Sequence, residues 1–400
     1  MKKVIKSRRF PGGSGAEVAE PRFEPMGTKS PQGHGEEGQS RCEANNGGSL
    51  HSPSLAANPS DAKACLIDLL KKTGLSLGAW IRESRMDMRV LSHSSELNAQ
   101  SRRVCAAIGV FDGLHLGHQQ VVRRMLSDAR QWDALSVAIT FDRHPNAVVA
   151  PDRAPPMLYT NRQKLKALED MGVDVVWMIP FDKAVSQTPG ETFVREMARD
   201  FPQLRGLSVG QDFAFGHRRS GSVALLEALG RELGFSVHGL EALSLGGEVV
   251  SSTRIRQAIQ TGRLEVADQM LGRPWALSGP VVTGDKLGGK LGFPTANLET
   301  TGLVLPPRGV YAALVVVRGE RHQAVVNIGI RPTLSHPTPT LRVEAHLLNY
   351  SGDLYGQELE IYFREKLREE QTFASLEKLT AQIHRDLEQA RRIFYAERLE

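Results

Sequence analysis

The sequence predicts an α/β protein with two folded domains behind a disordered N-terminal extension. From about residue 103, short apolar runs alternate with segments of helical period, which is typical of a parallel sheet flanked by helices. After residue 272, Gly and Pro separate frequent short strands, which favours a small antiparallel barrel or sandwich. Residues 10–60 are rich in Gly, Pro and Ser and poor in aromatics, so they predict disorder. We expect the extension to span residues 1–100, the first domain 101–272 and the second domain 273–400.

The first domain should contain five buried strands with helices between them. The expected strands are "VCAAIGVF", "LSVAITF", "VDVVWMIPF", "LRGLSVG" and "FSVHGLEALSL". The expected helices are "HQQVVRRMLSDARQW", "NRQKLKALEDMG" and "GSVALLEALGRELG", followed by "STRIRQAIQTG" and "LEVADQMLG" near residue 272.

The second domain should consist of short strands and one closing helix. The expected strands are "ALSGPVVTG", "GVYAALVVVRG", "RHQAVVNIG", "LRVEAHLL" and "QELEIYFREKL". Apolar residues near the C-terminus recur every three or four positions and predict an amphipathic helix: Leu376, Leu379, Ile383, Leu387, Ala390 and Phe394.

Composition narrows the classes of function. The chain has no apolar run long enough to span a membrane, so we expect no membrane partner. Its three cysteines, Cys42, Cys65 and Cys105, show no pairing or metal spacing, which suits a reducing cytoplasm. The net charge of +5 is dispersed, so the sequence does not predict nucleic-acid binding. We expect small-molecule partners and a monomer or weak oligomer.

The segment "GVFDGLHLGH" follows the first strand of the predicted sheet. It places His115 and His118 at a strand-to-helix turn, where free backbone N–H groups and the helix dipole favour a phosphate. Gly113 and Gly117 allow the backbone to approach a ligand closely. Two imidazoles there can donate hydrogen bonds to phosphate oxygens. A metal half-site and incidental surface histidines are the alternatives.

At this point the sequence resembles bacterial bifunctional riboflavin kinase/FAD synthetases. "GVFDGLHLGH" is similar to the H-x-G-H signature of nucleotidyltransferases. Further segments resemble the family in the same order: "TFDRHP", "VGQDFAFGHRRSG", "SSTRIR", "LGRPWALSGPVVTGDKLGGKLGFPTANL", "RGVYAA", "NIGIRPT" and "VEAHLL". The resemblance covers roughly residues 100–400. It implies a Rossmann-like FMN adenylyltransferase domain and a β-barrel riboflavin kinase domain.

Two further motifs belong to the first domain. "SSTRIR" offers three hydroxyls at a predicted helix N-terminus, with Arg254 and Arg256 behind them, and it can bind phosphate oxygens or simply cap the helix. An Arg can neutralise the leaving pyrophosphate, a role we expect for Arg254. The resemblance implies that "GQDFAFG" holds the flavin of FMN, where aromatic stacking is chemically natural; a core-packing loop is the alternative.

The second domain carries the glycine-rich segment "GDKLGGKLGFPTAN". It is not a Walker A sequence, but glycines and lysines suit a loop over ATP phosphates. Thr295 and Asn297 supply oxygen ligands suited to Mg²⁺, and the resemblance implies the same role. A turn with incidental polar residues is the alternative.

Glu344 lies in the predicted strand "LRVEAHLL". Alternation places it opposite the face of Val343 and beside Leu348, where a partly desolvated carboxylate could act as a base. An ordinary surface Glu is the alternative. The resemblance implies that Glu344 is the catalytic carboxylate of the kinase.

The resemblance thus implies a complete set of site residues, with ATP, riboflavin and FMN as substrates and Mg²⁺ as cofactor. The expected catalytic residues are Glu344, His115, His118 and Arg254. The expected ATP ligands are Gly109, Phe111, Asp112, His115, Gly117, His118, Ser251, Ser252, Thr253, Arg254, Gly284, Lys290, Thr295 and Asn297. The expected flavin ligands are Asp212, Phe213, Phe215, Arg308 and Gly309, and the expected metal ligands are Thr295 and Asn297.

Three other functions explain less of the sequence. A flavin- or nucleotide-binding regulator without turnover would be expected to lack Glu344 or the His pair. A nucleic-acid binder would show a basic stripe with interleaved aromatics. A nucleotidyltransferase for pantetheine phosphate or glycerol phosphate would leave residues 272–400 unexplained. The family resemblance begins near Met88, so we expect residues 1–87 to be an extension that both activities can do without.

Overall fold

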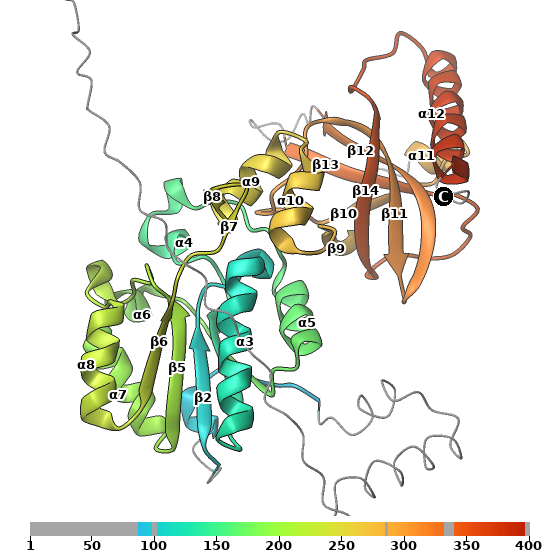
Figure 1. Cartoon of the computed structure of the whole chain (residues 1–400). Helices are drawn as coiled ribbons and strands as arrows, with labels where there is room; N and C mark the ends of the chain where they lie inside the picture. Colours follow the sequence, from blue (N-terminus) through green and yellow to red (C-terminus); the bar gives the residue numbers. More distant parts are fainter. Residues whose placement is uncertain (1–86, 98–101, 285–286, 332–339, 397–400) are drawn as a thin grey trace, which may run out of the picture. The chain divides into compact units, whose positions relative to one another are not determined.

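The computed structural model describes residues 87–97, 102–284, 287–331 and 340–396. These residues form a helix-flanked parallel sheet followed by a closed antiparallel barrel with a C-terminal helix (Figure 1). The fold class predicted from the sequence is confirmed. Of the two forms expected for the second domain, a barrel or a sandwich, the structure has the barrel. The residues 10–60, for which the sequence predicts disorder, lie outside the described residues.

The first domain contains a six-stranded sheet in the order β1-β4-β3-β2-β5-β6, and every pairing is parallel. The strands are β1 Arg89–Leu91, β2 Val104–Ile108, β3 Leu135–Phe141, β4 Val175–Ile179, β5 Leu204–Gly210 and β6 Ser236–Leu240. The main helices are α3 Leu116–Gln131, α5 Asn161–Met171, α7 Gly190–Asp200, α8 Val223–Leu233, α9 Ser252–Gln260 and α10 Leu264–Leu271. Shorter elements are α4 Asn146–Val149, α6 Lys183–Gln187 and the hairpin β7 Ser244–Leu245 and β8 Glu248–Val249.

Helices cover both faces of this sheet. Cys105 and Ala107 of β2 pack with Val122 and Met125 of α3. Ala106 packs with α7 and α8 on the other side, in a second core cluster. Because both faces are buried, β2 is an uninterrupted apolar run rather than an alternating one.

The strand order creates a switch point between β2 and β5. From β2 the chain proceeds outward through β3 and β4, then returns to the other side of β2 with β5. In such sheets, ligands bind outside the carboxyl ends of the strands at that point. The loop after β2 carries the His pair, and the loop after β5 carries "QDFAFG", so the fold brings the two motifs to the same edge.

The second domain is a six-stranded barrel closed in the order β10-β13-β12-β11-β14-β9. Its strands are β9 Leu277–Val282, β10 Ala296–Leu298, β11 Gly309–Val317, β12 Glu320–Arg331, β13 Thr340–Leu347 and β14 Glu358–Arg368. The sequence analysis missed β10 because three residues following a proline carry too little alternation to signal a strand. A short helix, α11 Leu287–Lys290, lies in the glycine-rich segment.

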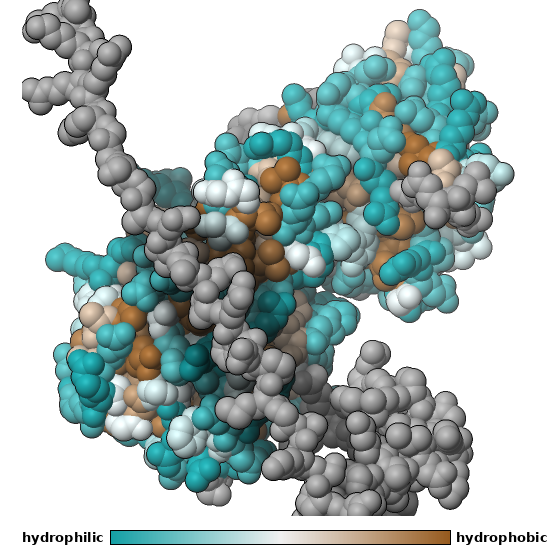
Figure 2. All heavy atoms as spheres, in the orientation of Figure 1, coloured by the Kyte–Doolittle hydropathy of each residue, from teal (hydrophilic) through white to brown (hydrophobic). Residues whose placement is uncertain are grey.

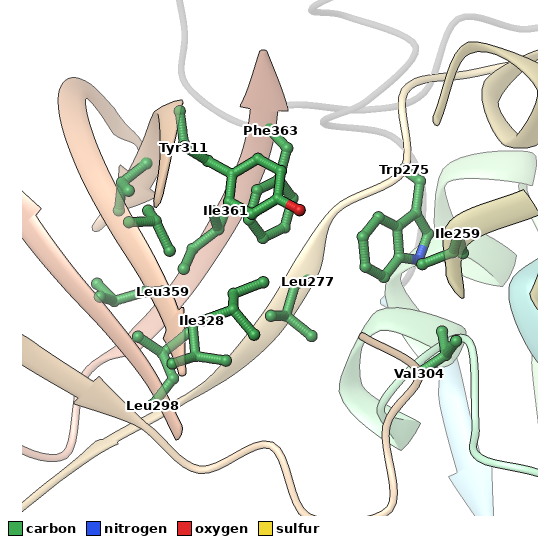
Figure 3. Close-up of a cluster of buried hydrophobic side chains, with 14 of the residues drawn as sticks. Ile259, Trp275, Leu277, Leu298, Val304, Tyr311, Ile328, Leu359, Ile361 and Phe363 are labelled. Atoms are coloured by element: carbon green, nitrogen blue, oxygen red, sulfur yellow. The ribbon is translucent and has the colours of Figure 1, made fainter. Parts of the chain in front are cut away.

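Apolar side chains fill the barrel, and the cluster continues toward the end of the first domain (Figure 3). Tyr311, Ile361 and Phe363 gather in one part of it, and Trp275 stacks on Phe363 with ring centroids 6.0 Å apart. The indole N–H of Trp275 donates to the carbonyl of Leu158, at 3.3 Å. Burial of an aromatic ring with its polar atom satisfied stabilises this junction.

The closing helix, α12 Leu376–Ala396, packs on the outside of the barrel. Ala390 and Phe394 contact Ala312 in one small cluster. Arg368 of β14 also donates to the buried carboxylate of Asp386, with the shortest N–O distance 2.8 Å. The predicted amphipathic helix therefore exists, and its apolar stripe covers one side of the barrel.

Hydrophilic side chains cover most of the described surface in the view of Figure 2. None of the described helices combines the length and apolar character that crossing a membrane requires.

The structure corrects the sequence analysis at two places in the first domain. Residues 89–97 were assigned to the extension, but β1 pairs with β4, and Leu91 and Leu97 are buried. Three residues are too few to show a strand pattern. Helix α7, "GETFVREMARD", was also missed, although it is as long as α5 and α8 and buries Val194 and Met197 on one face. The division at residue 272 stays a prediction.

We expect β1 to be part of the folded protein, so that the chain can be shortened to Met88 but not to residue 99 without loss of stability. A chain beginning at Met88 keeps β1, whereas one beginning at residue 99 loses two buried leucines and the bond from the Trp177 indole N–H to the Ser92 carbonyl. Burial of two leucines is worth roughly 3–6 kcal/mol. The chain starting at residue 99 should therefore melt at least about 6 °C lower than the chain starting at Met88. Equal melting temperatures in differential scanning calorimetry would contradict a structural role for β1.

Candidate active sites

The turn that follows β2 is conformationally strained. Phe111, Gly113 and Leu114 have φ values of 49°, 76° and 42°. For Phe and Leu this region costs of order 1–3 kcal/mol each, so the surrounding contacts must hold it. A Cβ on Gly109 would lie 2.7 Å from the Phe111 ring, so the strand end accepts only glycine without rearrangement. Such strain is typical of functional turns.

The two histidines stack on each other at the start of α3. His115 is the N-cap residue, and its Nδ1 accepts a hydrogen bond from the backbone N–H of His118, at 3.3 Å. The ring centroids lie 3.7 Å apart with an interplanar angle of 17°. Gly117 makes this arrangement possible, because a Cβ there would lie 3.2 Å from Cε1 of His115. Gly117 and the strand-to-helix turn together hold both imidazoles at the N-terminus of α3.

Both imidazoles are neutral at pH 7. Burial lowers the pKa of His115 to about 4, with help from the positive charges of Arg256 and Arg273. Burial also lowers the pKa of His118 well below its usual value, aided by His115, Lys164 and Arg256. Nδ1 of His118 is buried and has no hydrogen-bond partner among the described residues. Neutral imidazoles among three cations suit an anionic ligand.

The carboxylate of Asp112 has partners inside the protein, and the expected role of Asp112 as an ATP contact stays a prediction. Its carboxylate is buried and accepts from the backbone N–H groups of Leu158 and Tyr159, at 2.9 and 3.1 Å. It also accepts from Nη2 of Arg256 at 2.6 Å. Both oxygens are therefore engaged, and the structure assigns Asp112 to holding the turn in place.

The N-terminus of α9 lies against the same turn. Ser251 caps the helix, and the hydroxyl of Ser252 donates to the carbonyl of Asp112, at 3.1 Å. Thr253 is exposed. The guanidinium of Arg254 bonds to the carboxylate and carbonyl of Glu248 and to the next carbonyl in β8. Arg254 is therefore paired away from the turn, and its role with pyrophosphate stays a prediction.

Sequence reasoning missed two buried cations at this site. Arg256 was noted but not assigned, and the structure buries it against Asp112. Lys164 is fully buried, and its Nζ donates to the carbonyl of Phe141 at 2.8 Å. Burial lowers the pKa of Lys164 to about 8. The available signal was its position four residues before buried Leu168, on the apolar face of α5.

The loop after β5 presents two stacked phenylalanines. Phe213 and Phe215 have ring centroids 5.3 Å apart and an interplanar angle of 15°, and both are partly exposed. A Cβ on Gly221 would lie 2.5 Å from the Phe215 ring, so Phe215 is tightly held. Asp212 is exposed beside them. The pair thus forms an aromatic platform at the carboxyl end of β5.

A separate cavity of about 410 Å³ lies beside the barrel and α12. Thr295, Asn297 and Glu344 all line it, as the sequence analysis expected. Asn297 of β10 is directly opposite Glu344 of β13, and Asn327 of β12 is opposite Glu344 on the other side. The half-buried carboxylate therefore lies in a row between two amides.

The alternation expected for β13 is present. Val343 and Ala345 point into the barrel core, whereas Glu344 lines the cavity. Because neighbouring residues of a strand face opposite sides, the buried apolar pair fixes the carboxylate on the outer face.

Asn297 has the features of a cation ligand. Its Oδ1 is buried and has no hydrogen-bond partner among the described residues. A Cβ on Gly284 would collide with the Asn297 amide, so the glycine is required there. Thr295 adds a hydroxyl to the same cavity. Oxygen donors of this kind fit Mg²⁺. The side chain of Lys290 lies outside the described residues.

Arg308 and Gly309, expected to bind the flavin, do not line the cavity. Gly309 is buried with φ 148°, and a Cβ there would collide with Lys366. Exposed Arg308 lies 3.9 Å from Glu370, which does line the cavity. Among the described residues, Arg308 is therefore connected to the cavity through Glu370. The side chains that line it but were not expected include Asn327, Arg368 and Asp386.

Two family models match separate parts of the chain. Residues 97–254 match the FAD synthetase family model, and residues 271–394 match the riboflavin kinase family model. Bifunctional riboflavin kinase/FMN adenylyltransferase of Escherichia coli K12 is 38% identical over 309 residues, which cover 77% of this chain and 98% of that protein. The protein of the same name from Haemophilus influenzae is 37% identical, over 72% of this chain and 94% of the relative.

A solved structure gives a similar result for the fold. The crystal structure titled macrolide-efflux protein from Streptococcus pneumoniae has a TM-score of 0.64 and 25% identity. The match covers 76% of this chain and 99% of that one. Both domains are therefore found together in a protein of known structure.

The low pKa of His115 predicts how stability depends on pH. Between pH 6.5 and 4 the unfolded chain takes up a proton at residue 115 and the folded chain does not, so folded-state stability falls as the pH falls through this window. The full difference is roughly 3 kcal/mol. His115→Gln should reduce this dependence, while His118, whose pKa is also lowered by burial, retains part of it. His93→Gln, at an exposed position, should leave the dependence unchanged. Urea unfolding at pH 7 and pH 4.5 measures it, and parallel losses in all three proteins would contradict the assignment.

Proposed function

The chain belongs to the family of bifunctional riboflavin kinase/FMN adenylyltransferases, and from that membership we infer that it makes FMN from riboflavin and ATP, and FAD from FMN and ATP. Two sites of different chemistry support this function. The barrel cavity contains a carboxylate between two amides, and the turn after β2 contains neutral histidines among buried cations. This difference in chemistry between the two sites is the observation that supports the assignment of one reaction to each of them.

We propose that riboflavin is phosphorylated in the barrel cavity. The attacking group is a primary alcohol, which has to lose a proton as it bonds to phosphorus. Glu370 and Asp386 also line this cavity, but Asp386 accepts from Arg368 and Glu370 from the backbone N–H of Ile330. We therefore assign the proton acceptor to Glu344, which is half-buried in the cavity wall. Asn297 and Asn327 flank it in the adjacent strands.

The adenylyl transfer needs a different kind of site. The phosphate of FMN is already ionised, so its attack on the α-phosphorus of ATP requires no base. It requires alignment and stabilisation of the negative charge on the phosphate oxygens. His115 and His118 can donate hydrogen bonds to those oxygens, and Arg256 and Lys164 supply positive charge. We infer that Phe213, on the loop after β5, stacks on the flavin, supported by its partly exposed ring in the stacked pair with Phe215.

We propose that Thr295 and Asn297 hold Mg²⁺ in the kinase site, supported by the unpartnered Oδ1 of Asn297. When bound, Mg²⁺ would neutralise charge on the ATP phosphates. The expectations of a cytoplasmic location and of a monomer or weak oligomer stay predictions.

The competing functions explain less of the chain. A regulator without turnover has no need for both Glu344 and the His pair, and both lie in formed sites. A nucleotidyltransferase for another phosphate acceptor leaves the match of residues 271–394 to riboflavin kinase without a role.

Glu344→Gln should lower FMN formation from riboflavin by about 10²-fold or more, because a general base is lost. FAD formation from supplied FMN should stay at the parent level. Chromatographic separation of riboflavin, FMN and FAD after incubation with ATP measures both reactions. Glu365→Gln, at an exposed position of β14, is the matched control. Kinase activity within a few-fold of the parent would show that Glu344 is not the base.

Replacement of both His115 and His118 by Ala should abolish FAD formation while FMN accumulates from riboflavin. The reason is that the His pair lies in the first domain and the kinase cavity in the second. The same separation assay reports both products, with His93→Ala as the control at an exposed histidine. If a folded double variant loses FMN formation as well, the division of the two reactions between the sites is wrong.

A further inference from the structure

Arg273 follows Gly272, the residue that caps α10, and lies one residue beyond the predicted end of the first domain. Its guanidinium nevertheless points back into the adenylyl-transfer site. It donates to the backbone carbonyls of Gly113 at 2.8 Å and Leu114 at 3.1 Å. It also donates to the carbonyl of Leu271 at 3.1 Å and to the hydroxyl of Tyr159 at 3.0 Å. One side chain thus joins the turn after β2, the start of α5 and the end of α10.

The carbonyls of Gly113 and Leu114 belong to the strained turn. Both residues are buried and have positive φ, so their carbonyls do not join the regular hydrogen bonds of a strand or helix. Buried carbonyls without donors are costly, and a turn with that cost would relax to another conformation. Arg is suited to this place because its planar fork reaches several acceptors at once, which Lys cannot do.

Gln119 of α3 reinforces the same connection. Its Nε2 donates to the carbonyl of Leu114 at 2.9 Å and to that of Leu271 at 2.7 Å. Arg123 in turn donates to Oε1 of Gln119, at 2.7 Å. Gly272 lets α10 end against α3, since a Cβ there would lie 2.7 Å from Leu116 Cδ2. The end of α10 is therefore locked to the helix that carries the His pair.

Arg273 also acts on the His pair through its charge. It helps Arg256 and burial to lower the pKa of His115. A cation at this place therefore favours the neutral imidazole, the form with one N–H to donate and one ring nitrogen to accept the N–H of His118.

We propose that Arg273 is a positioning residue for adenylyl transfer, which holds the strained turn, and with it His115 and His118, in the reactive arrangement from a position in the segment between the two domains. This proposal rests on the proposed function of the His pair. It also implies that the functional end of the first domain lies beyond residue 272. Arg273 does not contact the reacting atoms in this role; it acts through the turn.

The test uses the full chain with Arg273→Gln and Arg273→Lys, and with Arg263→Gln as a control at an exposed arginine near the start of α10. Initial rates of FAD formation from supplied FMN give kcat and KM for ATP. The kinase rate from riboflavin is measured on the same samples. An NMR titration of the His115 ring reports its protonation without any turnover.

Arg273→Gln should lower kcat for FAD formation by about 10²-fold, the scale expected for misplacement of catalytic groups, with a much smaller change in KM. Arg273→Lys should have a kcat between those of the parent and of Arg273→Gln, because lysine retains the charge but lacks the planar guanidinium that reaches several carbonyls. The pKa of His115 should rise in the Gln variant and stay near the parent value in the Lys variant. The control should match the parent in every measurement.

A folded Arg273→Gln variant with parent kcat, or with an unchanged titration of His115, would overturn the proposal. If that variant does not fold, Arg273→Lys decides the question, because a folded Lys variant with parent kcat also overturns it. A wrong proposed function gives a different result. The parent protein itself would then make no FAD from FMN, while the titration of His115 would still change in the Arg273→Gln variant.

Discussion

The buried ion pair between Asp112 and Arg256 is the interaction on which the first site depends. Its two partners come from the turn after β2 and from α9, which are 144 residues apart in the chain. Asp112 also binds the backbone at the start of α5, and Arg256 binds the carbonyl of Pro156 at 2.6 Å. Removal of one partner of a buried pair leaves an uncompensated charge, at a typical cost of 3–5 kcal/mol. The pair therefore makes a strained turn persist where a lone loop would relax.

This constraint explains the electrostatic character of the histidines. The elements held by the pair bring Arg256, Lys164 and Arg273 close enough to influence buried imidazoles. Arg256, Lys164 and Arg273 carry three positive charges, whereas Asp112 carries one negative charge and is bound inside the protein. The site therefore favours anions. The same arrangement that stabilises the turn thus produces the property that a reaction between two phosphate compounds requires.

The kinase site is built on a different constraint, the register of a closed barrel. Closure pairs β10 with β13 and β13 with β12, so Asn297, Glu344 and Asn327 lie side by side. The apolar residues next to Glu344 are committed to the barrel core, and a slip of one residue would bury the carboxylate there. Core packing therefore fixes the direction of the Glu344 side chain, and α12 contributes residues such as Asp386 and Leu387 to the lining of the cavity.

Local pattern was enough to predict much of this protein. The apolar runs predicted β2 to β6, because strand burial and helix capping leave signals within about ten residues. The catalytic roles of His115, His118 and Glu344 are implied by the family resemblance and stay predictions. The sequence could not show that Arg254 turns toward β8 while Arg256 enters the core, since two arginines two residues apart look equivalent until the faces of α9 are packed. It also could not show that Lys164 is buried, that Asp112 is used internally, or that Arg273 reaches back across the predicted domain end. Those outcomes were decided by tertiary structure, because each depends on which distant backbone groups and charges surround a side chain once the chain has folded.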